Sequence, residues 1–268
     1  MANPIARDQW SSSEYNTKAS FVYSSAATAP VLALLDAQTS ETILDLGCGT
    51  GELTLALGKT VAPGGGRVIG LDASKDLLAA AEKLKGSREN VEFLLLDGHE
   101  VGEVEDGKET FDAVFSNAAL HWMKRDPKKV VKGVHKVLKK GGRFVAEMGG
   151  HLNMVGVRST LHAVLREHGH NPASMDPWYF PTAEAYQSIL ESAGFRVESA
   201  ELVPRITPVS AGLRGWLETF GFTFLDHLPP KEKEEVIEEV CKRLELDMKH
   251  ESGWQVMYVR LRIKAWKD

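Results

Sequence analysis

The sequence predicts an α/β fold in which the strands of a mostly parallel sheet are connected by helices. Between Thr42 and Met148, short apolar, β-branched runs alternate with longer runs of helical periodicity, which is the pattern of successive βαβ units. A glycine-rich turn follows the first short run, and acidic residues lie in or just after the first three. With 268 residues, 43% of them apolar, the chain is long enough for one such core and a modest additional layer.

Five strands are predicted in the first half: Thr42–Leu46, Arg67–Leu71, Val91–Leu96, Phe111–Phe115 and Arg143–Met148. The helices expected between them are Gly51–Lys59, Ser74–Leu84 and Pro127–Leu138. The third helix has proline in its first turn and is followed by Gly141 and Gly142, residue types that favour those positions. Residues 98–110 are polar, and we expect a loop there.

Helical patterns dominate after residue 150. Helices are expected at Val155–His168, Thr182–Ser192, Gly212–Phe224 and Pro230–Met248, and strands at Phe195–Leu202 and Trp254–Trp266. A turn rich in proline and aromatic residues, Asp176-Pro-Trp-Tyr-Phe-Pro181, precedes the second of these helices. Because no low-complexity linker separates the two halves, we expect the second half to pack onto the sheet.

Charge and composition exclude several classes of partner. The formal net charge is -5 and the pI is about 6.0, so nucleic acid and membrane surfaces are not expected partners. Two cysteines, Cys48 and Cys241, are too few for a disulfide framework or a four-thiolate zinc site. No stretch reaches the roughly 18 apolar residues of a membrane span, and the N-terminus lacks an apolar signal segment. We therefore expect a cytoplasmic protein.

The glycine-rich turn is the strongest local signal. In Ile43-Leu-Asp-Leu-Gly-Cys-Gly-Thr-Gly51 a buried strand leads directly into Gly47, Gly49 and Gly51. Glycines there permit a tight turn and let the backbone lie against a ligand at the carboxyl end of the sheet. A nicotinamide dinucleotide site would need its third glycine three residues after the second, where this chain has Glu52.

Three carboxylates sharpen the choice of ligand. Asp45 lies in the first strand, and Asp72 and Asp97 end the second and third, so they should converge at one edge of the sheet. Such a ring repels a pyrophosphate and attracts a ligand that carries a sulfonium and an ammonium. Asp72 follows Gly47 by 25 residues, a spacing suited to binding both ribose hydroxyls. The alternative is that Asp72 caps the helix near Ser74 and Asp97 only opens a loop.

At these residues the sequence resembles the class I S-adenosylmethionine-dependent methyltransferases. The resemblance implies a Rossmann-like sheet of seven strands that ends in an antiparallel hairpin, here Phe195–Leu202 with Trp254–Trp266, and a helical cap. It implies that Asp72 binds the ribose and Asp97 the adenine amino group, beside the backbone of Gly98 and His99. The full set of cofactor contacts it implies is Asp45, Gly47, Cys48, Gly49, Gly51, Asp72, Ala73, Asp97, Gly98, His99, Asn117 and Tyr15.

Within that superfamily the sequence is most similar to trans-aconitate methyltransferase-like proteins. The similarity is carried by the leader Trp10-x4-Tyr15-x5-Phe21-Val22, the run Ser116–Trp122 and the turn Trp178-Tyr-Phe-Pro181. It implies an N-terminal helical leader or lid over residues 1–40, a cofactor-binding α/β core over 41–150, and the rest of the sheet with helical cap insertions over 151–268. For Trp10 and Tyr15, ordinary helix packing is the alternative.

These features predict a methyltransferase that acts on a small molecule by in-line displacement and releases S-adenosylhomocysteine. His121, directly after the fourth strand, is the candidate base, or else a residue that shapes the pocket. The acceptor should contact side chains chosen for their rings or donors: Trp10, Trp122, His151, Trp178, Tyr179, Arg205, Arg214, Trp216 and Phe220. An arginine would hold a carboxylate acceptor, whereas the aromatic residues and His121 favour a phenolic hydroxyl.

Two subclasses of methyltransferase are disfavoured. Asn117 is followed by Ala118 and Ala119 instead of the Pro-Pro-aromatic run of nucleic-acid amino-methyltransferases. Phe115–Met123 contains no acid that would bind the metal of catechol enzymes, so no metal is expected. A non-catalytic regulatory protein that binds the same cofactor stays open as the alternative, and the pattern does not indicate an oligomeric state.

Overall fold

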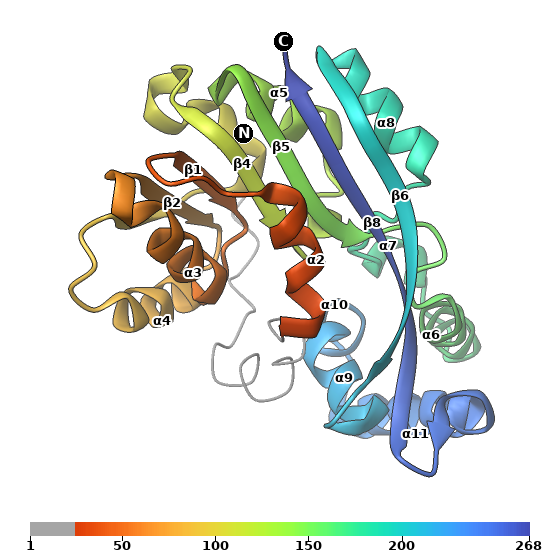
Figure 1. Cartoon of the computed structure of the whole chain (residues 1–268). Helices are drawn as coiled ribbons and strands as arrows, with labels where there is room; N and C mark the ends of the chain where they lie inside the picture. Colours follow the sequence, from red (N-terminus) through yellow and green to blue (C-terminus); the bar gives the residue numbers. More distant parts are fainter. Residues whose placement is uncertain (1–24) are drawn as a thin grey trace, which may run out of the picture.

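The computed structural model describes residues 25–268, which form a twisted sheet with helices on both faces (Figure 1). The strand order is β3-β2-β1-β4-β5-β8-β6. The strands are β1 (Thr42–Leu46), β2 (Arg67–Asp72), β3 (Val91–Leu95), β4 (Phe111–Asn117), β5 (Leu138–Gly149), β6 (Phe195–Pro208) and β8 (Gly253–Lys267). The first five are parallel, whereas β8 runs antiparallel between β5 and β6. The predicted Rossmann-like sheet with an antiparallel C-terminal pair is confirmed.

Helices cover the two faces of the sheet in separate cores. Helices α2 (Ser25–Leu35) and α3 (Glu52–Val61) bury apolar residues of one face, including Ile43 and Phe115. Helices α5 (Pro127–Val137) and α8 (Ala183–Ser192) bury the opposite face, where Leu44 and Phe144 lie. Helix α4 (Lys75–Lys85) packs beside β3. Because side chains alternate along a strand, consecutive residues such as Ile43 and Leu44 belong to different cores.

Strands β6 and β8 continue beyond the sheet as a two-stranded ribbon whose pairing reaches Pro208 and Gln255. Figure 1 shows α9 (Gly212–Phe220) and α11 (Pro230–Met248) at the far end of this ribbon. With α6 (Val155–Glu167), α7 (Pro172–Met175) and α10 (Phe222–Leu225) they surround a separate apolar core. We call these five helices the cap. No helix within residues 25–268 combines the length and apolar character needed to cross a membrane.

Several segments differ from the sequence prediction. The expected loop at 98–110 contains 3-10 turns, η3 (Gly98–Gly107), which begin where the Asp97 carboxylate accepts the His99 amide, 2.9 Å away. They are interrupted at Glu105 and Asp106, whose φ angles of 52° and 57° are left-handed. The helix expected at Gly212–Phe224 is divided into α9 and α10 at Gly221. β7 (Lys249–His250) is a further short strand paired with the start of β8.

Candidate functional site

The glycine-rich turn folds back over the end of β2. Gly47, Gly49 and Gly51 all have left-handed φ angles, 77°, 56° and 86°. The Gly47 amide donates to the carbonyl oxygen of Leu71 at 2.7 Å. A β-carbon on Gly47 would lie 2.2 Å from the Cβ of Ala119, so no other residue fits there without displacing that neighbour. The turn therefore requires glycine for its conformation and at Gly47 also for its packing.

The Asp72 carboxylate ties this turn to the start of α4. One oxygen accepts the Gly49 amide and the other accepts the Ser74 amide, both at 2.9 Å. Ser74 itself caps α4, because its hydroxyl oxygen accepts the Leu77 amide at 3.2 Å. The capping role thus belongs to Ser74, whereas Asp72, with Ala73 after it, lies between the glycine turn and the helix.

Asp45 is an unusual carboxylate directly below the turn. It is 2% exposed and accepts a hydrogen bond from the Thr54 hydroxyl at 2.7 Å. Burial, together with the smaller effect of the nearby Asp72 charge and against the effect of that hydrogen bond, raises the pKa of Asp45 to about 7. Burial, with the charges of Asp45 and Asp72, also raises the pKa of the Cys48 thiol. Two adjacent acids of this kind are stabilised by a bound cation.

Asp97 lies at the end of β3 and anchors the next segment. One oxygen accepts both the His99 amide at 2.9 Å and the His99 ring nitrogen Nδ1 at 2.6 Å, and the other accepts from Arg125 at 2.9 Å. Burial alone would raise the pKa of Asp97, but these hydrogen bonds outweigh it and lower that pKa. At Gly98 a β-carbon would lie 2.5 Å from the Cε of Met123, so the backbone passes close to that side chain.

The segment after β4 joins this region to a cavity. β4 ends at Asn117, and Ala118 follows with a left-handed φ of 57° and an amide that donates to the Glu147 carbonyl oxygen at 2.7 Å. Ala118 lines the cavity, whereas Ala119 packs against Gly47. The cavity and the glycine turn are therefore separated by only two residues of backbone.

The cavity lies between the sheet and the cap, and part of it is open to solvent. Five of the predicted side chains line it: His121, Trp122, Trp178, Trp216 and Phe220. Five residues that were not predicted complete the lining: Ala118, Asn153, Met154, Tyr258 and Arg260. An aromatic wall with a few polar groups is typical of a small-molecule site.

His121 is held in one tautomer at the wall of this cavity. The side chain is 7% exposed, and its Nδ1 accepts the Gly149 amide at 3.3 Å, which places the ring proton on Nε2. Burial, with the charge of Arg260, lowers the pKa of His121 to about 3. The Tyr179 amide donates to the His121 carbonyl oxygen at 2.9 Å and fixes the backbone. The ring is neutral near pH 7, and the nitrogen that lacks a proton is already engaged.

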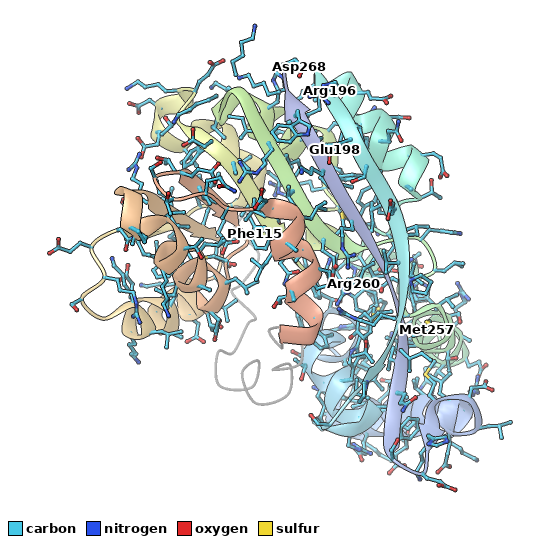
Figure 2. All side chains as sticks on the ribbon, viewed as in Figure 1. Phe115, Arg196, Glu198, Met257, Arg260 and Asp268 are labelled. Carbon is cyan, nitrogen blue, oxygen red and sulfur yellow. The ribbon has the colours of Figure 1, made fainter. Side chains whose placement is uncertain are left out.

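Arg260 gives the cavity a cationic end, and Figure 2 shows it on β8 where that strand runs from the sheet toward the cap. It is 5% exposed, and its guanidinium lies 4.5 Å above the Tyr258 ring. The buried Glu147 carboxylate accepts from Arg262 at 2.7 Å, while Arg260 and Arg205 approach it only to 4.0 and 3.9 Å. Among the described residues, three guanidinium groups thus surround one carboxylate.

Alternation along β8 could have revealed this end of the cavity. Tyr258, Arg260 and Arg262 are spaced by two and therefore lie on one face of the strand. The Tyr258 hydroxyl accepts from the Trp216 indole nitrogen at 2.6 Å, which links β8 to the cap helix α9. Alternation thus groups these three residues with one another, but only the pairing of β8 with β5 brings them near His121.

Both predicted arginines lie away from the cavity lining. Arg214 is on the surface of α9 and forms an ion pair with Glu234 of α11 at 2.8 Å. Arg205 faces α2, where it donates to the Ala27 carbonyl oxygen at 3.3 Å, and it reaches the cavity region only through Glu147. The arginine in the described cavity lining is instead Arg260, which the sequence analysis did not single out.

Two further predicted residues are also placed elsewhere. The His151 side chain is exposed, because the turn after β5 directs it outward, and its amide donates to the Pro181 carbonyl oxygen. Tyr179 packs against the core of the sheet. Trp10 and Tyr15 lie outside the described residues. Within residues 25–268, no three His, Cys, Asp or Glu side chains are arranged to hold a metal ion.

Known sequences resemble this chain over the same region and beyond it. A protein-family model described as "Methyltransferase domain" matches residues 44–146. The "Uncharacterized methyltransferase C70.08c" of Schizosaccharomyces pombe is 37% identical over 272 residues, which cover 98% of this chain and 100% of that protein. The juvenile hormone acid O-methyltransferase of Bombyx mori is 28% identical over 160 residues, 57% of this chain and 56% of that protein.

Solved structures share the fold. One is phosphoethanolamine N-methyltransferase 2 of Haemonchus contortus, in complex with phosphomonomethylethanolamine and S-adenosylhomocysteine. It superposes with a TM-score of 0.59 at 19% identity, and the superposition covers 96% of this chain and 56% of the Haemonchus contortus protein. Similarity at this level of identity concerns the arrangement of helices and strands.

Proposed function

Because the chain belongs to the class I S-adenosylmethionine-dependent methyltransferases, and S-adenosylmethionine is its methyl donor, we propose that it O-methylates a small carboxylic acid in the aromatic cavity. The observation that carries this proposal is Arg260, a buried guanidinium in a wall made mostly of rings. An acceptor that suits both features has an anionic group at one end and an apolar, preferably flat, body.

The glycine turn and the neighbouring carboxylates have the chemistry to hold the methyl donor. When bound, S-adenosylmethionine supplies a methyl group activated by a sulfonium. Gly47, Gly49 and Gly51 would let the backbone approach it, and in this proposal Asp72, which accepts the Gly49 amide, binds the ribose hydroxyls. In this proposal Cys48, Ala73 and Asn117 also contact the cofactor, and Asp97, Gly98 and His99 are the adenine-side segment. Asp45, whose pKa is raised in the free protein, would supply negative charge once a bound cation favours its ionised form.

The cavity favours a carboxylate over an amine or a phenol. None of the described lining residues is acidic, so an ammonium would meet the Arg260 cation and no carboxylate of the lining. A phenol has to lose its proton, but the free nitrogen of His121 already accepts the Gly149 amide. A carboxylate is ionised at neutral pH and needs no base. Juvenile hormone acid O-methyltransferase, a relative, is named for an acid substrate.

In this proposal His121 donates a hydrogen bond through Nε2 and does not remove a proton. Together with the Arg260 fork it would orient the carboxylate so that one oxygen faces the methyl group. The short backbone segment Ala118–Ala119 between the two sites keeps donor and acceptor close. The aromatic rings exclude water from the reacting atoms.

A panel of acceptors tests the proposal. Aromatic and branched aliphatic acids, matching phenols and matching amines are each incubated with S-adenosylmethionine, and release of S-adenosylhomocysteine is measured. Methyl ester formation, identified by mass spectrometry, is the expected result. Turnover of phenols or amines but not acids would contradict the carboxylate assignment. Tight cofactor binding with no release on a broad panel would favour the non-catalytic regulatory alternative.

Replacing Asp72 with asparagine should weaken S-adenosylmethionine binding by about 1.5–3 kcal/mol, the usual value of hydrogen bonds to a charged group. Calorimetric titration measures this directly. The matched control is Asp112→Asn, since Asp112 also accepts a strand amide, that of Thr42 at 2.8 Å, but lies away from the glycine turn. Parental affinity in Asp72→Asn would remove Asp72 from the cofactor site.

The affinity for S-adenosylmethionine should depend on pH through Asp45. With a pKa of about 7 in the free protein, this carboxyl carries a proton below neutral pH. A bound cation favours the ionised form, so binding releases that proton and strengthens as pH rises, by about tenfold from pH 6 to 8. Asp45→Asn should lack this component, and comparing the two proteins cancels the titration of the ligand's own amine.

A further inference from the structure

The segment from Asp176 to Pro181 is inserted between the sheet and the cap. The Trp178 ring lies in the cap core and lines the cavity, whereas the next side chain, Tyr179, packs in the core of the sheet. The Tyr179 amide holds the His121 carbonyl oxygen at 2.9 Å. The Phe180 ring lies 5.8 Å from the His121 ring and is stacked on Trp178 at 5.9 Å. This segment therefore contacts both the proposed acceptor site and the two cores around it.

Asp176 is the polar centre of that segment. Its side chain is 2% exposed, and one carboxylate oxygen accepts from Arg158 Nε at 2.7 Å and lies 3.0 Å from His162 Nε2. The other oxygen accepts the Trp178 amide at 3.0 Å. The main-chain oxygen of Asp176 accepts from Lys124 at 2.8 Å. A single buried residue thus connects α6, the cavity-lining tryptophan and the segment after β4.

The partners of Asp176 also support the surrounding rings. The Arg158 guanidinium lies 5.3 Å above the Phe180 ring, and the His162 ring meets Phe224 edge-on at 5.6 Å. Phe224 in turn lies 5.4 Å from Trp178. If the charge at Asp176 is lost, Arg158 and His162 lose their common anionic partner, and the two rings that flank Trp178 lose their support.

We propose that Asp176 is a positioning residue that fixes Trp178 and thereby sets the affinity for the methyl acceptor. This inference rests on the proposed function, because it takes the cavity to be the acceptor site. It assigns to Asp176 no contact with the acceptor or with S-adenosylmethionine. Its effect should therefore fall on acceptor binding and not on the methyl donor or on the chemical step.

Asp176→Asn keeps the shape of the side chain and removes its charge. We expect the KM of the acceptor to rise by about ten- to thirtyfold, as for loss of hydrogen bonds to a charged group. The turnover number should stay within about threefold, and the Kd of S-adenosylmethionine within about twofold, because neither site loses a contact. The control is Asp226→Asn, an exposed cap acid that pairs with Lys233 at 2.7 Å. An unchanged acceptor KM with only a lower urea midpoint would overturn the proposal.

A second readout does not depend on activity. Acrylamide quenching of tryptophan fluorescence should increase in Asp176→Asn, and this increase should vanish when both proteins also carry Trp178→Phe. Should Asp176→Asn fail to fold, Arg158→Gln offers a milder change at a partly exposed partner, with Arg158→Lys as the charge-conserving rescue. Quenching that stays at the parental value in the folded variant would contradict the proposal. If no acceptor is turned over, the proposed function fails, while the quenching experiment still tests Asp176.

Discussion

Replacing Arg260 with methionine should lower kcat/KM for a carboxylate acceptor by about 100- to 1000-fold, or roughly 3–4 kcal/mol, while the Kd of S-adenosylmethionine stays nearly unchanged. The physical reason is desolvation. Arg260 is buried beside Tyr258 and Glu147, so a carboxylate that enters the cavity loses its water and needs a cation in return. Methionine fills a similar volume without charge, and steady-state kinetics on the acid identified by the panel measures the loss.

Two controls separate this effect from general damage. Arg214→Met removes an arginine of the cap helix α9 that forms an exposed ion pair with Glu234, and should change kcat/KM by less than about threefold. Arg260→Lys keeps the charge without the planar guanidinium, so its kcat/KM should lie between those of the parent and Arg260→Met. The neutral methyl ester of the acid serves as a second control, with its affinity measured as an inhibitor. If Arg260→Met weakened binding of this ester as much as it lowered kcat/KM for the acid, Arg260 would shape the cavity instead of binding the anion.

The glycine turn and its neighbouring carboxylates, the proposed cofactor half of the site, could be predicted from the sequence because their signals are local. Gly47 to Gly51 follow a β-branched strand directly, and left-handed φ angles are needed at three positions where only glycine adopts them easily. Parallel neighbouring strands then bring Asp45 and Asp72 together, as the contribution of the Asp72 charge to the raised pKa of Asp45 reflects. Each step depends on residues close together in the chain and on the order of β1 and β2.

The cavity proposed to bind the acceptor could be predicted only in part, because it depends on pairings between distant segments. Trp178, Trp216 and Phe220 were found from their type and line the cavity. Arg260, in contrast, reaches the cavity only because β8 inserts antiparallel next to β5, more than 100 residues after His121. Arg214 was chosen for its guanidinium, yet its place on the outer side of α9 gives it a nearer partner in Glu234. Residue type indicates what a site needs, but register decides which residue supplies it.

His121 should be replaceable by a residue that donates a hydrogen bond but not by an apolar one. If its Nε2 holds the acceptor, His121→Phe should lower the turnover number by about 100-fold, while His121→Gln should retain activity to within about tenfold. If His121 were a base, both variants would lose its full contribution of about 100-fold or more, since neither phenylalanine nor glutamine accepts a proton. Turnover of the three proteins on one acid decides between the two roles.

The dependence on pH gives an independent test of the same residue. Because the pKa of His121 in the folded protein is about 3, well below the ordinary value, the ring should stay neutral through the working range. The parental turnover should then show no fall as pH drops through 6.5, which a histidine base of ordinary pKa requires.

The stability of the fold should also depend on pH through His121. In the unfolded chain this ring binds a proton below about pH 6.5, so the stability due to the neutral ring is complete above pH 6.5. It declines toward pH 3 by at most about 1.4 kcal/mol per pH unit. Urea unfolding should reveal this extra slope in the parent and not in His121→Gln, and a fall in parental turnover through pH 6.5 that disappears in the variant would restore His121 as the base.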